Sequence, residues 1–153
     1  METAAHLGHT QNRRPLASRR LSVGLEVDFT SQSAAQAPVG EAWKAIVKTY
    51  LRPELCEHPE RGCPLAALGP ELARADKGMK PQIVAELVNY KRQMLPFMPG
   101  RRTVDKERAF FAIFSTMIGA VELARMLPGP AMREKVLASA RDFLLRSFGP
   151  SQS

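Results

Sequence analysis

Apolar side chains recur at helical spacing through most of the chain from Gly40 onward. The first such segment has them three and four residues apart, at Ala42, Trp43, Ile46, Val47, Tyr50 and Leu51. This spacing places them on one face of an amphipathic helix. Pro53 ends the segment, because proline lacks an amide donor and restricts the residue before it. The charged stretch that follows, residues 54–62, predicts a loop.

Two further helices are predicted, each with a proline in its first turn, where the missing N–H costs little. The second runs from Pro64 to about Ala75, and the third from about Lys80 to Leu95. The apolar positions are Leu65, Leu68 and Leu72 in the second helix and Ile83, Val84, Leu87, Val88 and Leu95 in the third. Lys91 is a charged exception on the apolar side of the third helix.

The fourth predicted helix is the most apolar, and its apolar residues cover nearly the whole circumference. They are Phe110, Phe111, Ile113, Phe114, Met117, Ile118, Val121, Leu123 and Met126. Thr103 is expected to cap its N-terminus, with Asp105 and Glu107 favourably placed near the positive end of the helix dipole. Such a helix must be buried on more than one side.

A fifth helix follows the tight connection 128–130 and continues to about Phe148. The pattern as a whole predicts an all-α fold of about five helices joined by short links, which is typical of a bundle. Residues 40–148 form this domain. Residues 1–39 are rich in Ser, Thr, Gln, Ala and Arg, and we expect a mostly disordered or loosely packed tail, although 21–29 alternates like a short strand.

The 153-residue chain has a formal net charge of +7, of which the tail contributes only +1. The basic residues of 40–153 are dispersed, whereas a nucleic-acid binder usually concentrates them on one element or face. Dispersed surface charge is therefore the interpretation we favour. No run reaches the roughly 20 apolar residues of a membrane span, and the N-terminus lacks the apolar core of a signal peptide. We expect a soluble, cytoplasmic protein.

Catalytic and metal-binding chemistry has little support in the sequence. Cys56 and Cys63 lack the tight pairing of a structural zinc site, so reduced thiols and no metal are expected. The three histidines, His6, His9 and His58, fall in the tail or in a charged loop. Glu122 interrupts the apolar fourth helix, either as a buried acid or as the partner of Arg125 or Arg108. We predict no enzyme activity and no cofactor.

Three segments together carry a resemblance to a known family. They are the run Gly62-Cys-Pro-Leu-Ala-Ala-Leu68 with the Glu-Leu-Ala-Arg that ends at Arg74, the stretch from Phe114 to Arg125, and the closing segment from Leu137 to Leu144. The chain resembles the C-terminal ligand-binding and dimerisation domain of one branch of the bacterial TetR-type transcriptional regulators. The resemblance covers roughly residues 40–148.

The resemblance implies a homodimer in which the last two helices of each subunit form a four-helix interface. It also implies an apolar pocket for a small hydrophobic or aromatic ligand. In this family the ligand acts because it binds one of two arrangements of the protein more tightly than the other. The interface residues would be Met117, Val121, Ala124, Val136, Ala140 and Leu144, and alanine or aspartate at Val121 or Leu144 should loosen the dimer. The ligand-binding residues would be Tyr90, Met94, Phe97, Phe110, Phe114 and Met117. The alternative for each of these ligand-binding residues is a plain core position.

The chain departs from the family at its N-terminus. A complete member carries a helix-turn-helix there, and residues 1–39 show no apolar period that could supply one. We therefore expect no specific DNA binding by this chain alone. Either the chain is truncated or has a misassigned start, or it works without contacting DNA directly. The alternative to a ligand sensor is an interaction protein that heterodimerises with full-length regulators and binds no ligand.

Overall fold

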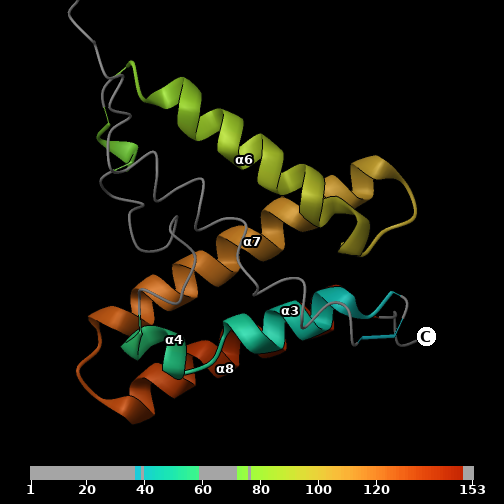
Figure 1. Ribbon diagram of the computed structural model, residues 1–153. Coiled ribbons are helices and arrows are strands. Elements are labelled where there is room, and N and C mark those ends of the chain that lie inside the picture. Colours follow the sequence, from blue (N-terminus) through green and yellow to red (C-terminus); the bar gives the residue numbers. More distant parts are fainter. Residues whose placement is uncertain (1–36, 39, 59–71, 76, 150–153) are drawn as a thin grey trace, which may run out of the picture.

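The computed structural model describes residues 37, 38, 40–58, 72–75 and 77–149. In this described part the fold is all-α, and the prediction of five helices is confirmed. The α-helices are α3 (Ala42–Tyr50), α4 (Glu54–Glu57), α6 (Lys80–Met94), α7 (Thr103–Met126) and α8 (Pro130–Ser147), with a 3-10 turn η2 (Leu95–Phe97) after α6 (Figure 1). Residues 1–36, for which we expected a tail with a strand-like run, lie outside the described residues.

Helix α3 has the predicted apolar face, and that face is buried. Trp43, Ile46 and Val47 are each at most 2% exposed. The helix ends before Pro53, and the N–H of Leu51 donates to the carbonyl of Val47 at 3.0 Å. The guanidinium of Arg141, on α8, donates to the carbonyl of Leu51 at 2.9 Å, so the open end of α3 is held by a neighbouring helix.

The prediction of a loop from residue 54 is wrong for its first part. Glu54–Glu57 forms α4, a single helical turn that starts directly after Pro53. Proline at the start of a turn has the dihedral angle that a helix needs, and the acidic residues favour its positive end. Arg125 of α7 donates to the carbonyl of Leu55 at 3.0 Å, which supplies a tertiary partner that the sequence pattern cannot show.

The second predicted helix lies almost entirely outside the described residues. Of its apolar positions, Leu72 is described and is buried. The third predicted helix corresponds to α6, with Pro81 in its first turn as expected. Tyr90 and Met94 are its buried residues. Lys91, the charged exception, makes an ion pair with Glu107 of α7, and its ammonium lies 5.7 Å from the centre of the Phe111 ring.

The N-terminus of α7 differs from the prediction by one residue. Arg102, rather than Thr103, is the N-cap, and Thr103 begins the helix. The carboxylate of Asp105 accepts hydrogen bonds of 2.9 Å from the Nε and Nη2 atoms of Arg102 and one of 3.4 Å from its backbone N–H. A carboxylate three residues into a helix can satisfy the N-cap amide, so Asp105 supplies the capping that Thr103 was expected to provide.

Helix α7 forms the centre of the described fold and crosses the middle of the molecule in Figure 1. It contacts α3, α4, α6, η2 and α8, and its contact with α8 is the most extensive. Its residues from Ala109 to Ala124 supply eight of the buried side chains. The helix thus packs against several other elements, but the apolar residues Phe111, Leu123 and Met126, which were expected to be buried with the rest, remain exposed.

Among the described residues, α7 is the one helix long and apolar enough to cross a bilayer, and 44% of its most apolar window is buried inside the protein. The central helix of a soluble bundle has the same length and composition. Its contacts with other helices explain the apolar character of its buried side.

Candidate functional site

Three of the predicted ligand-binding residues form an aromatic cluster between α6 and α7. The ring of Tyr90 lies 4.9 Å from that of Phe114 and 6.1 Å from that of Phe110, measured between centroids. Phe110 and Phe114 are stacked at 5.2 Å with an interplanar angle of 16°. At these separations the rings are in direct contact.

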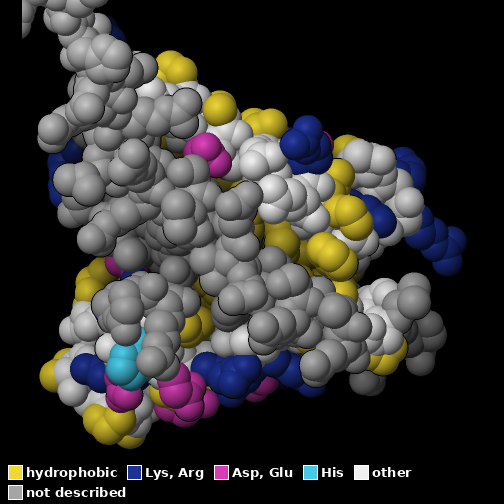
Figure 2. Space-filling view, in the orientation of Figure 1, with side chains coloured by type: hydrophobic (Ala, Val, Ile, Leu, Met, Phe, Trp, Pro, Cys, Tyr) yellow, Lys and Arg dark blue, Asp and Glu magenta, His cyan; other side chains and the backbone are white. Residues whose placement is uncertain are grey.

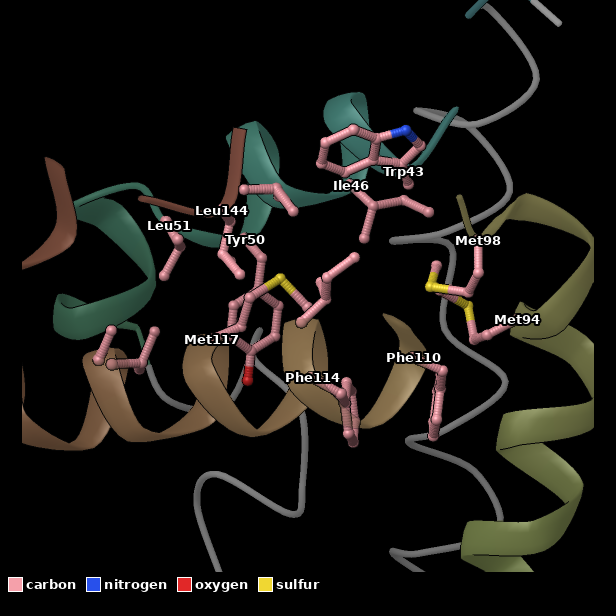
Figure 3. Packing of buried hydrophobic residues seen from close by; sticks show 14 of the residues in the cluster. Trp43, Ile46, Tyr50, Leu51, Met94, Met98, Phe110, Phe114, Met117 and Leu144 are labelled. Carbon is pink, nitrogen blue, oxygen red and sulfur yellow. The ribbon is translucent and has the colours of Figure 1, made fainter. Parts of the chain in front are cut away.

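Met94 and Met117 extend this cluster, and each is 2% exposed. Figure 3 shows both methionines with Phe110 and Phe114 in the packed interior that α3, α6 and α7 share. The structure therefore brings five of the six predicted ligand-binding residues into one continuous apolar core.

Phe97, the sixth predicted residue, lies elsewhere. It is 37% exposed and lines an open cleft of about 600 Å³. The cleft is bounded by the start of α3 and the residues before it, the loop 96–100, Lys106 in the first turn of α7, and Phe148 directly after α8. Figure 2 shows apolar side chains between the C-terminal end of α6 and the beginning of α3, on this side of the molecule.

The sequence pattern does not indicate a site at Trp43, Lys44, Lys106 or Phe148. All four line the cleft with Phe97. They come from three helices that are far apart in the chain, so no local pattern connects them. The one local signal was the break Pro96 to Gly100, since irregular loops between helices commonly form the walls of binding sites.

Among the described residues that line the cleft, two lysines and one acid are charged. The ammonium of Lys44 lies 2.6 Å from Oε1 of Glu41 and 5.8 Å from the centre of the Trp43 ring. Within the described part of the chain, Lys106 makes no ion pair. Lys44 thus compensates Glu41, and the cleft keeps one net positive charge.

Gly100 fixes the loop that forms one wall. Its φ is +131°, a conformation that side-chain-bearing residues rarely adopt. A Cβ at this position would lie 2.9 Å from the amide nitrogen of Lys106 and 3.0 Å from the Cβ of Asp105. The loop therefore packs directly on the first turn of α7, and only glycine permits that approach.

The predicted dimer residues occupy two different environments. Met117, Val121, Ala124 and Leu144 lie inside the core of the single chain, each at most 2% exposed. Val136 and Ala140 are half-buried and pack against the edge of that core. Four of the six residues therefore hold α7 and α8 within one subunit, and they present no surface to a second copy.

The outward faces of α7 and α8 carry large apolar side chains instead. We call this surface the outer face: it consists of Phe111, Leu123 and Met126 on α7 and Met132 and Phe143 on α8, each between 48% and 74% exposed. On α7 the positions between them are small or polar, namely Ala112, Ser115, Thr116 and Gly119. Figure 2 shows some of this apolar surface near the connection of α7 and α8.

The residues considered for catalysis have ordinary structural partners or lie at the surface. Glu122 accepts a 2.8 Å hydrogen bond from Arg125, so the ion-pair interpretation is confirmed. His58 is exposed, while His6 and His9 lie outside the described residues. In the described ranges no group of three or more acidic, histidine or cysteine side chains could hold a metal ion.

Cys56 is a free thiol at the edge of α4, and Cys63 lies outside the described part of the chain. Partial burial raises the pKa of the Cys56 thiol, and the nearby Arg125 and Arg133 oppose this without overcoming it. A raised pKa keeps the thiol protonated and weakly nucleophilic, which is the opposite of an activated cysteine.

Compared with known protein families, curated proteins and solved structures, the chain matches none of them. The resemblance to TetR-type regulators therefore remains a prediction from the sequence. What the geometry establishes is a helical core, an open cleft with one net positive charge and an exposed apolar outer face.

Proposed function

We propose that residues 40–148 form the ligand-sensing and dimerisation domain of a TetR-type transcriptional regulator, which acts as a homodimer in the bacterial cytoplasm. The last two described helices agree with this proposal, because the long helix α7 packs along α8, which follows it. The proposal includes no enzyme activity, no membrane association and no specific DNA contact by this chain alone.

The observation that carries the proposal is the outer face. Leu123 and Met126 lie three residues apart on the side of α7 that faces away from its buried residues, and Phe111 is exposed twelve residues before Leu123, where Lys91 of α6 contacts its ring. Large apolar side chains gathered on one surface mark an interaction site more often than scattered exposed ones do. The small residues between them allow a second helix to approach closely, and a symmetric pair would bury the same surface on both copies.

Within this proposal, the buried residues predicted for the interface act indirectly. Val121 and Leu144 set the packing of α7 on α8, and so they position the outer face without touching a partner. Val136 and Ala140, at the edge of the core, lie on the flank of α8 that includes Met132 and Phe143. The contact between subunits is accordingly assigned to the exposed apolar residues.

The direct test replaces one outer-face residue with a charged one. Leu123→Glu would place a carboxylate in the subunit contact, where desolvation opposes association. We expect sedimentation to show a dimer for the unmodified chain and a monomer with unchanged helix content for the variant. Gln93→Glu, which adds the same charge at an exposed position of α6, is the matched control and should stay dimeric. Equal association of both variants would refute the assigned interface.

A second candidate function is an interaction protein that pairs with full-length regulators and binds no ligand. The contacts between Tyr90, Phe110 and Phe114 favour it, because among the described residues these three rings pack directly on one another. Subunit exchange into a full-length regulator, together with no change in melting temperature across a panel of hydrophobic ligands, would support this function. A ligand-induced rise in melting temperature would support the sensor.

A further inference from the structure

We propose that the cleft beside Phe97 is a binding site for a small amphipathic anion, in which an aromatic or other apolar ring carries a single carboxylate. The apolar part would lie against the aromatic walls, and the carboxylate would face Lys106. Its volume of about 600 Å³ is within the usual range for small-molecule sites. The site differs from the closed cluster around Phe110, and it contains only Phe97 of the six residues predicted from the sequence.

The walls of the cleft are apolar and well supported. Trp43 is 2% exposed, and its ring meets that of Phe148 edge to face at 6.2 Å between centroids. Met98, on the opposite side, is buried, and Phe97 beside it stays partly exposed at the mouth. A ring placed at this mouth would contact the exposed part of Phe97 and displace water from it, with the buried Trp43 and Met98 supporting the wall behind.

The charges that line the cleft favour a negatively charged ligand. Glu41 is already compensated by Lys44, so a cationic ligand would find no free acid there. Lys106 lines the same cleft and makes no ion pair in the part of the chain that the structure describes. A ligand carboxylate would therefore add a favourable interaction with Lys106, and an uncharged ligand of the same shape would lack it.

The backbone around Lys106 is fixed before any ligand arrives. Gly100 packs on the Lys106 amide, and Arg102 and Asp105 hold the first turn of α7. Pre-organised walls reduce the entropy that binding must overcome. The cleft also touches the start of α3 and the residue after α8, so an occupant would contact segments that are far apart in the chain.

The role of such a ligand as an effector rests on the proposed function, whereas its binding does not. Coupling to dimerisation requires that the monomer and the dimer bind it differently. The two ideas are therefore measured separately. Binding is observed at Trp43 whatever the oligomeric state, and association is measured by sedimentation with and without the bound probe.

Trp43 provides the readout, since it is the only tryptophan in the chain and forms a wall of the cleft. We would titrate the full chain with phenylbutyrate and with its uncharged analogue phenylbutanol, and follow the single indole N–H resonance by NMR. We expect both compounds to shift this resonance in a saturable way, and phenylbutyrate to bind about fivefold more tightly, as a partly exposed ion pair would give.

Two variants test the assignment. Lys106→Met should remove the preference for phenylbutyrate and leave phenylbutanol binding unchanged, while Lys48→Met, an exposed lysine of α3 outside the cleft, should leave both unchanged. No saturable shift with either compound, or a preference for phenylbutyrate that survives Lys106→Met, would overturn the proposal. A dimer seen by sedimentation together with either of those results would reject the cleft alone and leave the proposed function standing.

Discussion

Two single residues fix the junction between the loop 96–100 and α7. Gly100 adopts a positive φ and approaches the Lys106 amide, and Asp105 caps the helix for which Arg102 is the N-cap. Neither role follows from residue type alone. A glycine after proline predicts a loop, but the close approach that excludes a side chain depends on how the loop folds back onto the helix.

Gly100→Ala should destabilise the protein by about 1–3 kcal/mol, because it combines an unfavourable φ with a steric overlap at the Lys106 amide. Gly40 is the matched control. It also has a positive φ, of +85°, but a Cβ there would meet no atom within 4 Å. Urea unfolding of both variants measures the difference. Gly40→Ala should be the milder change, and equal losses would show that the contact at Lys106 contributes nothing.

The pKa of Asp105 is lowered, chiefly by its hydrogen bonds from the Arg102 side chain. A carboxyl group with a lowered pKa in the folded state stabilises the fold above its ordinary pKa, and this contribution is lost as the pH falls through the lowered value. We therefore expect the protection of the first-turn amides of α7, measured relative to their intrinsic exchange rates, to fall only at acidic pH. Asp105→Asn should remove this pH dependence, and a variant that keeps it would exclude Asp105 as the cause.

At the level of the helices, the spacing of apolar residues predicted most elements. It missed the features that depend on contacts with distant segments of the chain. The stripe on α3 and the continuous apolar character of α7 were enough to place both helices. The turn α4 was missed because its partner, Arg125, is about 70 residues away in the chain. On α7 and α8, Val121 and Leu144 were assigned to an interface because the resemblance implies one, and both are buried within their own subunit. The apolar pattern alone does not separate residues that face their own subunit from residues that face outward.

Adjacent positions on α8 test this separation of inward and outward sides. Leu144 is fully buried and Phe143 is 56% exposed. Leu144→Ala should lower the free energy of unfolding by about 2–5 kcal/mol, as truncation of a buried leucine does. Phe143→Ala should weaken association with little effect on subunit unfolding, measured by urea unfolding and sedimentation on the same samples. A large loss of subunit stability in Phe143→Ala would contradict its place on the outer face.

At the scale of the whole molecule, the candidate site was predictable only in part. Aromatic and methionine residues on two helices correctly indicated an apolar cluster, but their spacing could not show whether it encloses a cavity. The cleft beside Phe97 depends on Trp43, Lys106 and Phe148, which three separate segments bring together. Side chains from distant segments become neighbours only through the packing of the complete fold.

The outer face of α7 and α8 connects the fold with the proposed function. In a monomer these apolar side chains would remain in water, where nothing offsets their exposure. In a dimer they would be buried against their own copies. The central claim is therefore that two subunits associate through this surface.

The measurement that tests this claim most directly is the mass of the unmodified chain in solution, determined by sedimentation equilibrium over a wide concentration range. We expect twice the mass of the single chain at micromolar concentration. Leu123→Glu should give the mass of the single chain instead. The mass of a single chain at every concentration would contradict the account.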